Sequence, residues 1–289
     1  MKFLRLSYRV RLILFCVLSC LLVLSISLMA EIRYNDNRIE TVYYPMQSSR
    51  IPASFSGFRI AQVSDLHNDA LGDGNASLLK LLQEAEPDII AVTGDLIDSR
   101  KTDTQIALQF MQKALQIAPV YYVTGNHEIA LYATYPPFER ELRNAGVTVL
   151  NNESVLLEQN GQNIVLLGLS DPNANDLARD ERIALMQSCS QEYFTVVLSH
   201  RPELFDDYCT ARADVVLTGH AHGGQVRLPF IGGLYAPGQG LLPQYDAGLF
   251  TQGTTHMIVS RGVGNSLFPF RVNNRPELAV IELQSATLG

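Results

Sequence analysis

The stretch FRIAQVSDLH, residues 58–67, is a short apolar run that stops at a polar cluster containing Asp65 and His67. Continuous apolar runs of this length are typical of strands that are buried on both faces. Four further runs have the same form: DIIAVTGDLID (88–98), VYYVTGNHE (120–128), YFTVVLSH (193–200) and ADVVLTGH (213–220). The repeated pattern predicts five buried strands, each ending on polar side chains.

Helical periodicity separates the first three runs, at residues 76–86 and 104–118. Strands that alternate with helices predict βαβ units and a largely parallel sheet. Residues 147–169 instead predict two strands, an Asn-Gly turn at 160–161 and a further strand, as an antiparallel insertion or a second sheet. Residues 31–57 are interpreted as a spacer leading into a first strand, which is expected to be antiparallel.

Five of the six histidines of the chain fall in the polar clusters, and only His256, predicted to be structural, lies outside them. Ligands collect at the carboxyl ends of parallel strands, so the clusters are expected to meet at one mouth. Carboxylates, imidazoles and an amide oxygen suit divalent cations such as Mn²⁺, Zn²⁺ or Fe²⁺. The candidate side chains are Asp65, His67, Asp95, Asp98, Asn126, His127, His200, His220 and His222.

The segment GHAHGG, residues 219–224, places two histidines one residue apart where an apolar run ends. Residues i and i+2 of a strand point to the same side, so His220 and His222 are expected to face one side together. Two such imidazoles can hold one metal ion or two adjacent ions. The alternative for an isolated pair of this kind is two surface histidines.

Taken together, the motifs resemble the signature of the calcineurin-like metallophosphoesterases. They are D-x-H at 65–67, G-D-x-x-D at 94–98, G-N-H-E at 125–128, the lone His200 and G-H-x-H at 219–222. The segments that follow, to residue 284, are similar to a bacterial branch of single-pass membrane phosphodiesterases. The resemblance covers about residues 40–284 and implies an α/β protein, a four-layer α/β-β/α sandwich around a dinuclear metal site.

The resemblance also implies roles for individual residues. One metal ion would be held by Asp65, His67 and His222, and a second by Asn126, His200 and His220. Asp95 would bridge the two ions. His127 would protonate the leaving oxygen or stabilise the charged phosphoryl group, and Asp98 would orient His127. The alternative for Asp98 is the N-cap of the following helix.

The implied function is hydrolysis of a P–O bond, most simply in a phosphodiester, with a metal-bridging hydroxide as nucleophile. Two alternatives stay open: a non-catalytic metal-binding scaffold and a nuclease of the same superfamily. The net charge of −7 and the lack of a basic stripe argue against nucleic acid as a partner. Gln225, Arg261 and Arg271 are candidates for contacts with the substrate phosphate, or are ordinary structural residues, and Asp171 is interpreted as a turn former.

The N-terminus predicts a membrane anchor. Residues 12–30 contain no charge and no proline, and the four basic residues before them leave −11 on the rest of the chain. Such a run is just long enough to cross a bilayer, and the positive-inside rule keeps the basic end cytoplasmic. The division predicted is residues 1–11 cytoplasmic, 12–30 transmembrane, 31–57 spacer and first strand, and 58–289 an extracytoplasmic catalytic domain. The alternative is a cleaved signal and a secreted enzyme.

Anchoring directs the search for a phosphoester substrate toward phospholipid head groups and lipid-linked sugar phosphates. The apolar segments LPFIGGLY (228–235) and SLFPF (266–270) are candidates for contact with the membrane interface, or else pack as ordinary loops. The four cysteines are too few for a disulfide scaffold, and Cys189 and Cys209 are expected to be free.

Overall fold

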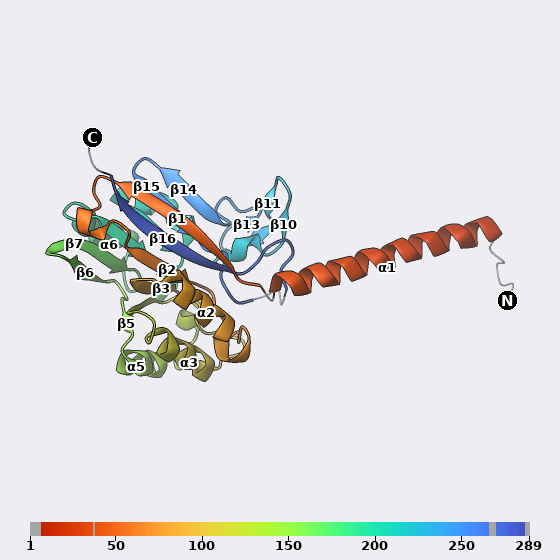
Figure 1. Cartoon of the computed structure of the whole chain (residues 1–289), viewed down its shortest axis with the longest axis horizontal. Coiled ribbons are helices and arrows are strands. Elements are labelled where there is room, and N and C mark those ends of the chain that lie inside the picture. The colour runs from red at the N-terminus through yellow and green to blue at the C-terminus, as the bar shows by residue number, and fades with distance from the viewer. Residues whose placement is uncertain (1–6, 37, 266–269, 287–289) are drawn as a thin grey trace.

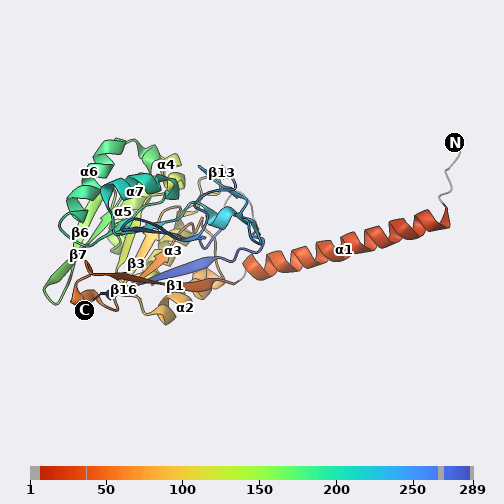
Figure 2. The ribbon, with the colours of Figure 1, turned by 90° about the horizontal axis from the view of Figure 1, so that it is seen from above.

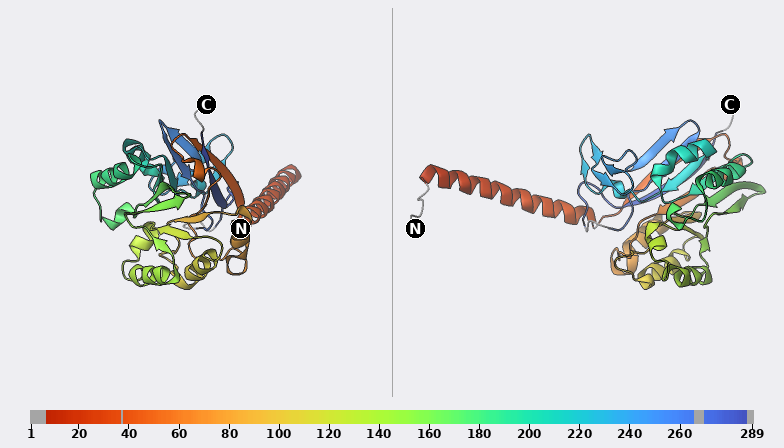
Figure 3. Two further views of the ribbon diagram at one scale, coloured as in Figure 1. Left: turned by 60° about the vertical axis from the view of Figure 1, so that its left-hand side comes forward. Right: turned by 180° about the vertical axis from the view of Figure 1, so that it is seen from behind.

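The computed structural model describes residues 7–36, 38–265 and 270–286. It contains two six-stranded sheets, with the strand orders β1-β16-β2-β3-β4-β5 and β14-β15-β9-β8-β7-β6. The sheets lie face to face, and helices cover the outer face of each (Figures 1 and 3). This is the four-layer α/β-β/α sandwich that the sequence predicts.

The first sheet is built from β1 (Glu40–Ser48), β2 (Arg59–Val63), β3 (Ile89–Thr93), β4 (Val120–Val123), β5 (Thr148–Val149) and β16 (Glu277–Ser285). Strands β2 to β5 are parallel to one another, as the predicted βαβ units require. The helices of this half are α2 (Ala76–Ala85), α3 (Thr104–Ala114), α4 (Asn126–Ala130) and α5 (Tyr135–Ala145).

The second sheet contains β6 (Glu153–Gln159), β7 (Gln162–Gly168), β8 (Thr195–Leu198), β9 (Val215–Thr218), β14 (Gly248–Gln252) and β15 (Thr255–Val259). Strands β6 and β7 form the antiparallel hairpin around the predicted Asn-Gly turn, so the segment 147–169 does lead into a second sheet. Helices α6 (Arg179–Ser190) and α7 (Phe205–Ala211) cover its outer face (Figure 2). The short strands β10 (Arg227–Leu228), β11 (Gly232–Gly233), β12 (Tyr235–Ala236) and β13 (Gly240–Leu241) form two small hairpins between β9 and β14.

Three apolar cores hold the four layers together. In β3, Ile90 and Val92 face the helices, whereas Ala91 on the opposite face packs between the two sheets. In β9, Leu217 packs between the sheets and Val216 packs against α6 and α7. Both faces of these strands are therefore buried, which is why their sequences are continuously apolar rather than alternating.

The first strand was predicted to be antiparallel, and that prediction is wrong. Strand β1 pairs in parallel with β16, which in turn runs antiparallel to β2. The C-terminal strand β16 lies between β1 and β2. The strand that pairs with β1 is therefore more than two hundred residues further along the chain.

Helix α1 (Tyr8–Asp36) extends away from the sandwich (Figures 1 and 2). Within its stretch Tyr8–Glu31, an 18-residue window has a mean hydropathy of 2.8, and none of that window is buried against the rest of the protein. Its length and composition suffice to cross a membrane.

Candidate metal centre

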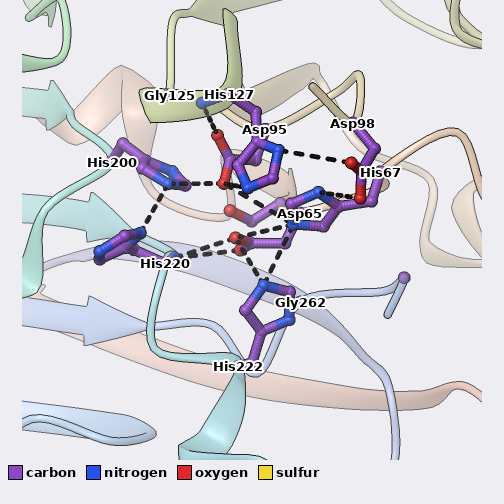
Figure 4. Close-up of polar contacts among 12 residues, drawn as sticks. Asp65, His67, Asp95, Asp98, Gly125, His127, His200, His220, His222 and Gly262 are labelled. Carbon is purple, nitrogen blue, oxygen red and sulfur yellow. Dashed lines mark hydrogen bonds and ion pairs between the residues drawn. The ribbon is translucent and has the colours of Figure 1, made fainter. Parts of the chain in front are cut away.

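The predicted polar clusters meet where the carboxyl ends of β2, β3 and β4 face those of β8 and β9. The local backbone is unusual, because Asp65, His67, Asp95, His220 and His222 all have positive φ angles between 48° and 65°. Few non-glycine residues adopt this conformation, and those that do concentrate at functional sites. From these turns the labelled carboxylate and imidazole side chains point toward one another (Figure 4).

The side chains form two adjoining groups of donor atoms. In the first, Nε2 of His222 lies 3.1 Å from Nε2 of His67 and 3.4 Å from Oδ1 of Asp65. In the second, Nε2 of His200 lies 3.1 Å from Nδ1 of His220 and 3.2 Å from Oδ2 of Asp95.

Asp95 stands between the two groups. Its Oδ2 is also 3.6 Å from Nε2 of His67, so one carboxylate oxygen faces donors of both groups. Within each group the donor atoms lie close enough together to hold one ion. This is the spatial relation expected of a bridging ligand between two metal ions.

The donor set fits divalent cations on two grounds. First, Oδ1 of Asn126 is a buried acceptor that has no hydrogen-bond partner among the described residues. Buried polar atoms are normally paired, so an unpaired acceptor that lines the same cavity as Asp95 is suited to a positively charged partner. Second, the imidazoles of His67 and His222 bring two ring nitrogens to 3.1 Å, an approach that a shared cation stabilises.

Burial sets the protonation of the first group. It lowers the pKa of His67 to about 4 and lowers that of His222 well below its usual range. Both rings are therefore neutral near pH 7, which is the form that binds metals. Burial also raises the pKa of Asp65 to about 6.

In the second group, the interaction between the charges of His200 and Asp95 outweighs the effect of burial on the pKa of each. Burial alone would lower the pKa of His200, but the adjacent Asp95 carboxylate raises it to about 10. Asp95 itself has a pKa well below its usual range despite its burial, because His200 stabilises its charge. The carboxylate thus favours a positive charge at this point, whether on an imidazole or on a cation.

His127 lies at the edge of the centre, and a backbone hydrogen bond to its Nδ1 fixes the orientation of its ring. The backbone N–H of Ser99 donates to Nδ1 of His127 at 3.0 Å, so a neutral ring carries its proton on Nε2. Nε2 lies 4.0 Å from Oδ2 of Asp95 and borders the open cavity.

The Asp98 carboxylate lies 3.7 Å from Nδ1 of His127 and equally 3.7 Å from Nδ1 of His67. Its hydrogen bonds go to Arg100 instead, at 2.7–3.2 Å. Asp98 is not a helix N-cap, because α3 begins at Thr104 and Asp103 accepts the capping hydrogen bond.

The reason given above for the common direction of His220 and His222 is wrong. Strand β9 ends at Thr218, and both histidines lie in turns with positive φ. The alternation of a strand therefore does not apply, and the rings point to different groups: His220 to His200, and His222 to His67.

A cavity of about 320 Å³ opens over the centre. Eleven residues line it: Asp95, Ser99, Arg100, Asn126, His127, His220, Ala221, His222, Gln225, Tyr235 and Pro237. Gln225 therefore lies where a substrate would contact it. Arg261 and Arg271 instead hold neighbouring structure, because Arg261 pairs with Glu277 at 2.6 Å and the buried Arg271 donates to two backbone carbonyls.

Two supporting residues escaped prediction. The buried Glu128 accepts hydrogen bonds from the backbone N–H groups of Asp95, Ile97 and Gly125, and so ties the turn after β3 to the turn after β4. Its place as the last residue of the G-N-H-E motif was a sequence signal, although no role was predicted for it.

Arg201 pairs with Asp171 at 2.5 and 3.1 Å and donates to Nε2 of His220 at 2.9 Å. Asp171 is thus more than a turn former, although it does accept the turn hydrogen bond from Asn173. His256 is far from these contacts and hydrogen-bonds with Thr251 in the β14–β15 hairpin. Cys189 and Cys209 are free, as predicted.

Two sheets that bring carboxylate, imidazole and amide donors to one edge define a metal-dependent hydrolase with two adjacent metal positions. The family model of calcineurin-like phosphoesterases matches residues 58–224, and the chain belongs to that family. It is accordingly a metallophosphoesterase, a hydrolase of phosphoric esters, and its family uses a dinuclear metal centre.

Several proteins are similar over most of the chain. The metallophosphoesterase YkuE of Bacillus subtilis is 31% identical over 86% of this chain and 86% of its own length. The phosphodiesterase YaeI of Escherichia coli is 28% identical over 78% and 82%. A bovine transmembrane protein with a metallophosphoesterase domain is 30% identical over 86% of this chain and 57% of its own length. Among solved structures, the sulfate thiohydrolase SoxB of Thermus thermophilus aligns with a TM-score of 0.52 at 12% identity, over 80% of this chain and 57% of its own, which is a likeness of fold.

Proposed function

We propose that this protein is a membrane-anchored phosphodiesterase with two divalent metal ions. The observation that carries the proposal is the pair of donor groups that share Asp95 beneath the proton-bearing Nε2 of His127. One ion would be held by Asp65, His67 and His222. The other would be held by Asn126, His200 and His220. Mn²⁺, Zn²⁺ and Fe²⁺ all suit this donor set.

When bound, the ions would lower the pKa of a coordinated water and neutralise charge on the phosphoryl group. The other steps belong to side chains. His127 would act in its imidazolium form: Nε2–H would give its proton to the leaving oxygen while Nδ1–H faces the Asp98 carboxylate at 3.7 Å, and a neutral ring would remain. Asp98, which lies within 4 Å of that ring and pairs with Arg100, would support its orientation by charge. Preference for a diester agrees with the printed name of YaeI.

The anchor is α1, with residues 12–30 as the membrane-crossing part and residues 1–11 in the cytoplasm. Its support is the apolar, unburied stretch Tyr8–Glu31 and the basic residues at its start. The positive-inside rule then puts the catalytic domain, residues 58–289, outside the cytoplasm. A substrate held in or on the same membrane follows from this placement, either a phospholipid or a lipid-linked sugar phosphate.

The decisive experiment measures metal content and activity on the same purified full-length protein. Hydrolysis of an aryl phosphodiester should cease after prolonged chelation and return with Mn²⁺ or another divalent ion. A panel of phosphomonoesters, phosphodiesters and lipid phosphodiesters, each with and without detergent, then orders the substrates. Full activity in excess chelator, or a preference for monoesters across the panel, would contradict the proposal.

A further inference from the structure

The C-terminal end of α1, here called its root, and the metal centre lie at the same end of the first sheet. Helix α1 ends at Asp36, and β1 begins at Glu40. Strand β1 runs parallel to β16, and β16 runs antiparallel to β2. The start of β1 therefore lies at the same end of the sheet as the end of β2, which Asp65 follows in the chain.

Side chains connect the two features directly. Arg261 bonds both to Glu40, at 2.9 Å, and to Glu277, at 2.6 Å. The next residue, Gly262, packs so closely on Asp65 that an added Cβ would lie 2.8 Å from the Cβ of Asp65. From residue 30, where the proposed membrane-crossing part ends, six helical residues to Asp36 add about 9 Å, and the four residues to Glu40 span at most about 14 Å. The anchor therefore keeps this end of the domain within about 23 Å of the membrane-crossing part.

The segment between β9 and β14 starts and finishes at that same end. Strand β15 is parallel to β9, and β14 is antiparallel to β15, so the end of β9 and the start of β14 lie together. The hairpins β10–β11 and β12–β13 project from there, beside the root of α1 in both views (Figures 1 and 2).

Residues 228–242 of this segment, here called the apolar rim, contain no charged residue. They nevertheless carry exposed apolar side chains, including Phe230, which is fully exposed, and Leu241, which is 80% exposed. Outside α1, the described part of the chain has ten large exposed hydrophobic residues, and six of them are in the rim. The six are Leu228, Phe230, Ile231, Tyr235, Leu241 and Leu242.

We propose that the apolar rim lies on the surface of the lipid bilayer that holds α1, an inference that rests on the anchoring part of the proposed function. Apolar clusters of this kind mark interaction surfaces in soluble domains. Uncharged loops with Phe, Ile and Leu suit the boundary between head groups and acyl chains. The short link between α1 and β1 favours lipid as the occupant, because it keeps this end of the domain at the membrane.

The rim also forms part of the wall of the catalytic cavity. Tyr235 and Pro237 line that cavity together with His127 and Arg100. A docked rim would thus carry the cavity to the membrane interface. A phosphoester with an apolar tail could then present its phosphate to the metal centre while its tail stays in the bilayer.

The test uses the absence of tryptophan from the chain. Full-length Phe230→Trp protein is reconstituted into vesicles whose lipids carry bromine on the acyl chains, either near the head group or near the chain end. Emission should be roughly two-fold lower with shallow bromine than with unbrominated lipid and less affected by deep bromine, because interfacial side chains enter about 5–10 Å. The matched control is Leu156→Trp on β6, an exposed residue at the other end of the molecule, which should not be quenched.

The outcomes separate this inference from the proposed function. Protein that stays with the vesicles but shows equal emission with and without bromine at position 230 would overturn the docked rim and leave the anchor intact. Blue-shifted emission without quenching would also overturn it, since protein would then cover Phe230. Protein that does not sediment with vesicles contradicts the anchor itself, whatever its activity.

A kinetic arm tests the consequence for substrates. Phe230→Glu with Ile231→Glu should lower hydrolysis of a vesicle-borne lipid phosphodiester roughly ten-fold or more, because charge opposes entry into the interface. Hydrolysis of a soluble aryl phosphodiester should stay within about two-fold of wild type, since both side chains are exposed outside the cavity. Equal rates on the vesicle substrate before and after substitution would refute the role of the rim, and Leu156→Glu serves as the control variant.

Discussion

Replacing His127 by alanine should lower turnover of an alkyl phosphodiester by roughly 10²–10⁴-fold, the usual loss when a general acid is removed. At 1.36 kcal/mol per ten-fold, this is about 2.7–5.4 kcal/mol of transition-state stabilisation. The structure positions the ring for this step, because the backbone N–H of Ser99 orients it through Nδ1 and Nε2 lies 4.0 Å from the Asp95 oxygen at the middle of the centre.

The assay compares an alkyl with an activated aryl leaving group, and it measures metal content in parallel. An activated aryl oxygen needs little protonation, so the loss caused by His127→Ala should be much smaller there, with both metals retained. Ser99→Ala is the matched control: the backbone N–H that positions His127 remains, and only the hydroxyl at 3.1 Å is lost. Its turnover should stay close to that of wild type.

Two results would refute the reasoning. Equal losses on both leaving groups would mean that His127 binds the phosphoryl group and does not protonate the leaving oxygen. Loss of metal from the His127→Ala protein would make this residue a ligand, and the division between ligands and acid would then be wrong.

Four further predictions concern the metal centre, the fold and the membrane. Asp95→Asn should remove most bound metal, as measured by elemental analysis, because the amide carries no charge between the two groups. Glu128→Gln should lower the free energy of unfolding by about 1–3 kcal/mol, since an amide leaves at least one buried N–H unsatisfied. The control Glu139→Gln, which removes the carboxylate of a half-buried ion pair with Arg143 four residues on, should cost about 0.3–0.5 kcal/mol. Burial raises the pKa of Asp214 to about 6, so its contribution to stability is complete below about pH 4 and declines as pH rises through 6. Denaturant titrations across this window should show a smaller decline in Asp214→Asn than in wild type, and the remaining decline comes from Asp65, whose pKa is raised to the same range. A topology reporter fused after residue 289 should be active outside the cytoplasm and remain bound to membranes, and release of an active reporter would reveal a cleaved signal.

The strands and the donor residues could be predicted because both leave local marks in the sequence. Strands buried on both faces need continuous apolar runs, and the ends of such strands are where polar ligands collect. The partners of β1 leave no such mark. Its neighbour β16 lies at the far end of the chain, and no turn residue or periodicity links the two.

The roles of the two supporting residues, Glu128 and Arg201, could not be predicted for a related reason. Glu128 and Arg201 act through hydrogen bonds to backbone groups and to residues from other strands, so their roles depend on tertiary placement. Most carboxylates and arginines are exposed, so the sequence alone predicts that such a residue next to a candidate histidine is an ordinary surface charge. The structure instead buries Glu128 completely and leaves only 12% of the Arg201 side chain exposed.

The strain at the centre explains why these supports are needed. Five of the proposed ligands hold left-handed backbone conformations, each costing about 1 kcal/mol or more for a residue with a side chain. Close approaches at glycine make the turns possible: an added Cβ on Gly94 would lie 2.6 Å from His200, and one on Gly219 would lie 2.4 Å from Asp65. The hydrogen bonds that the Glu128 carboxylate accepts from backbone N–H groups then offset part of the strain by tying two of the turns together. Cations that bind only the folded arrangement would offset more of it, so the proposed ligands would couple metal binding to folding stability.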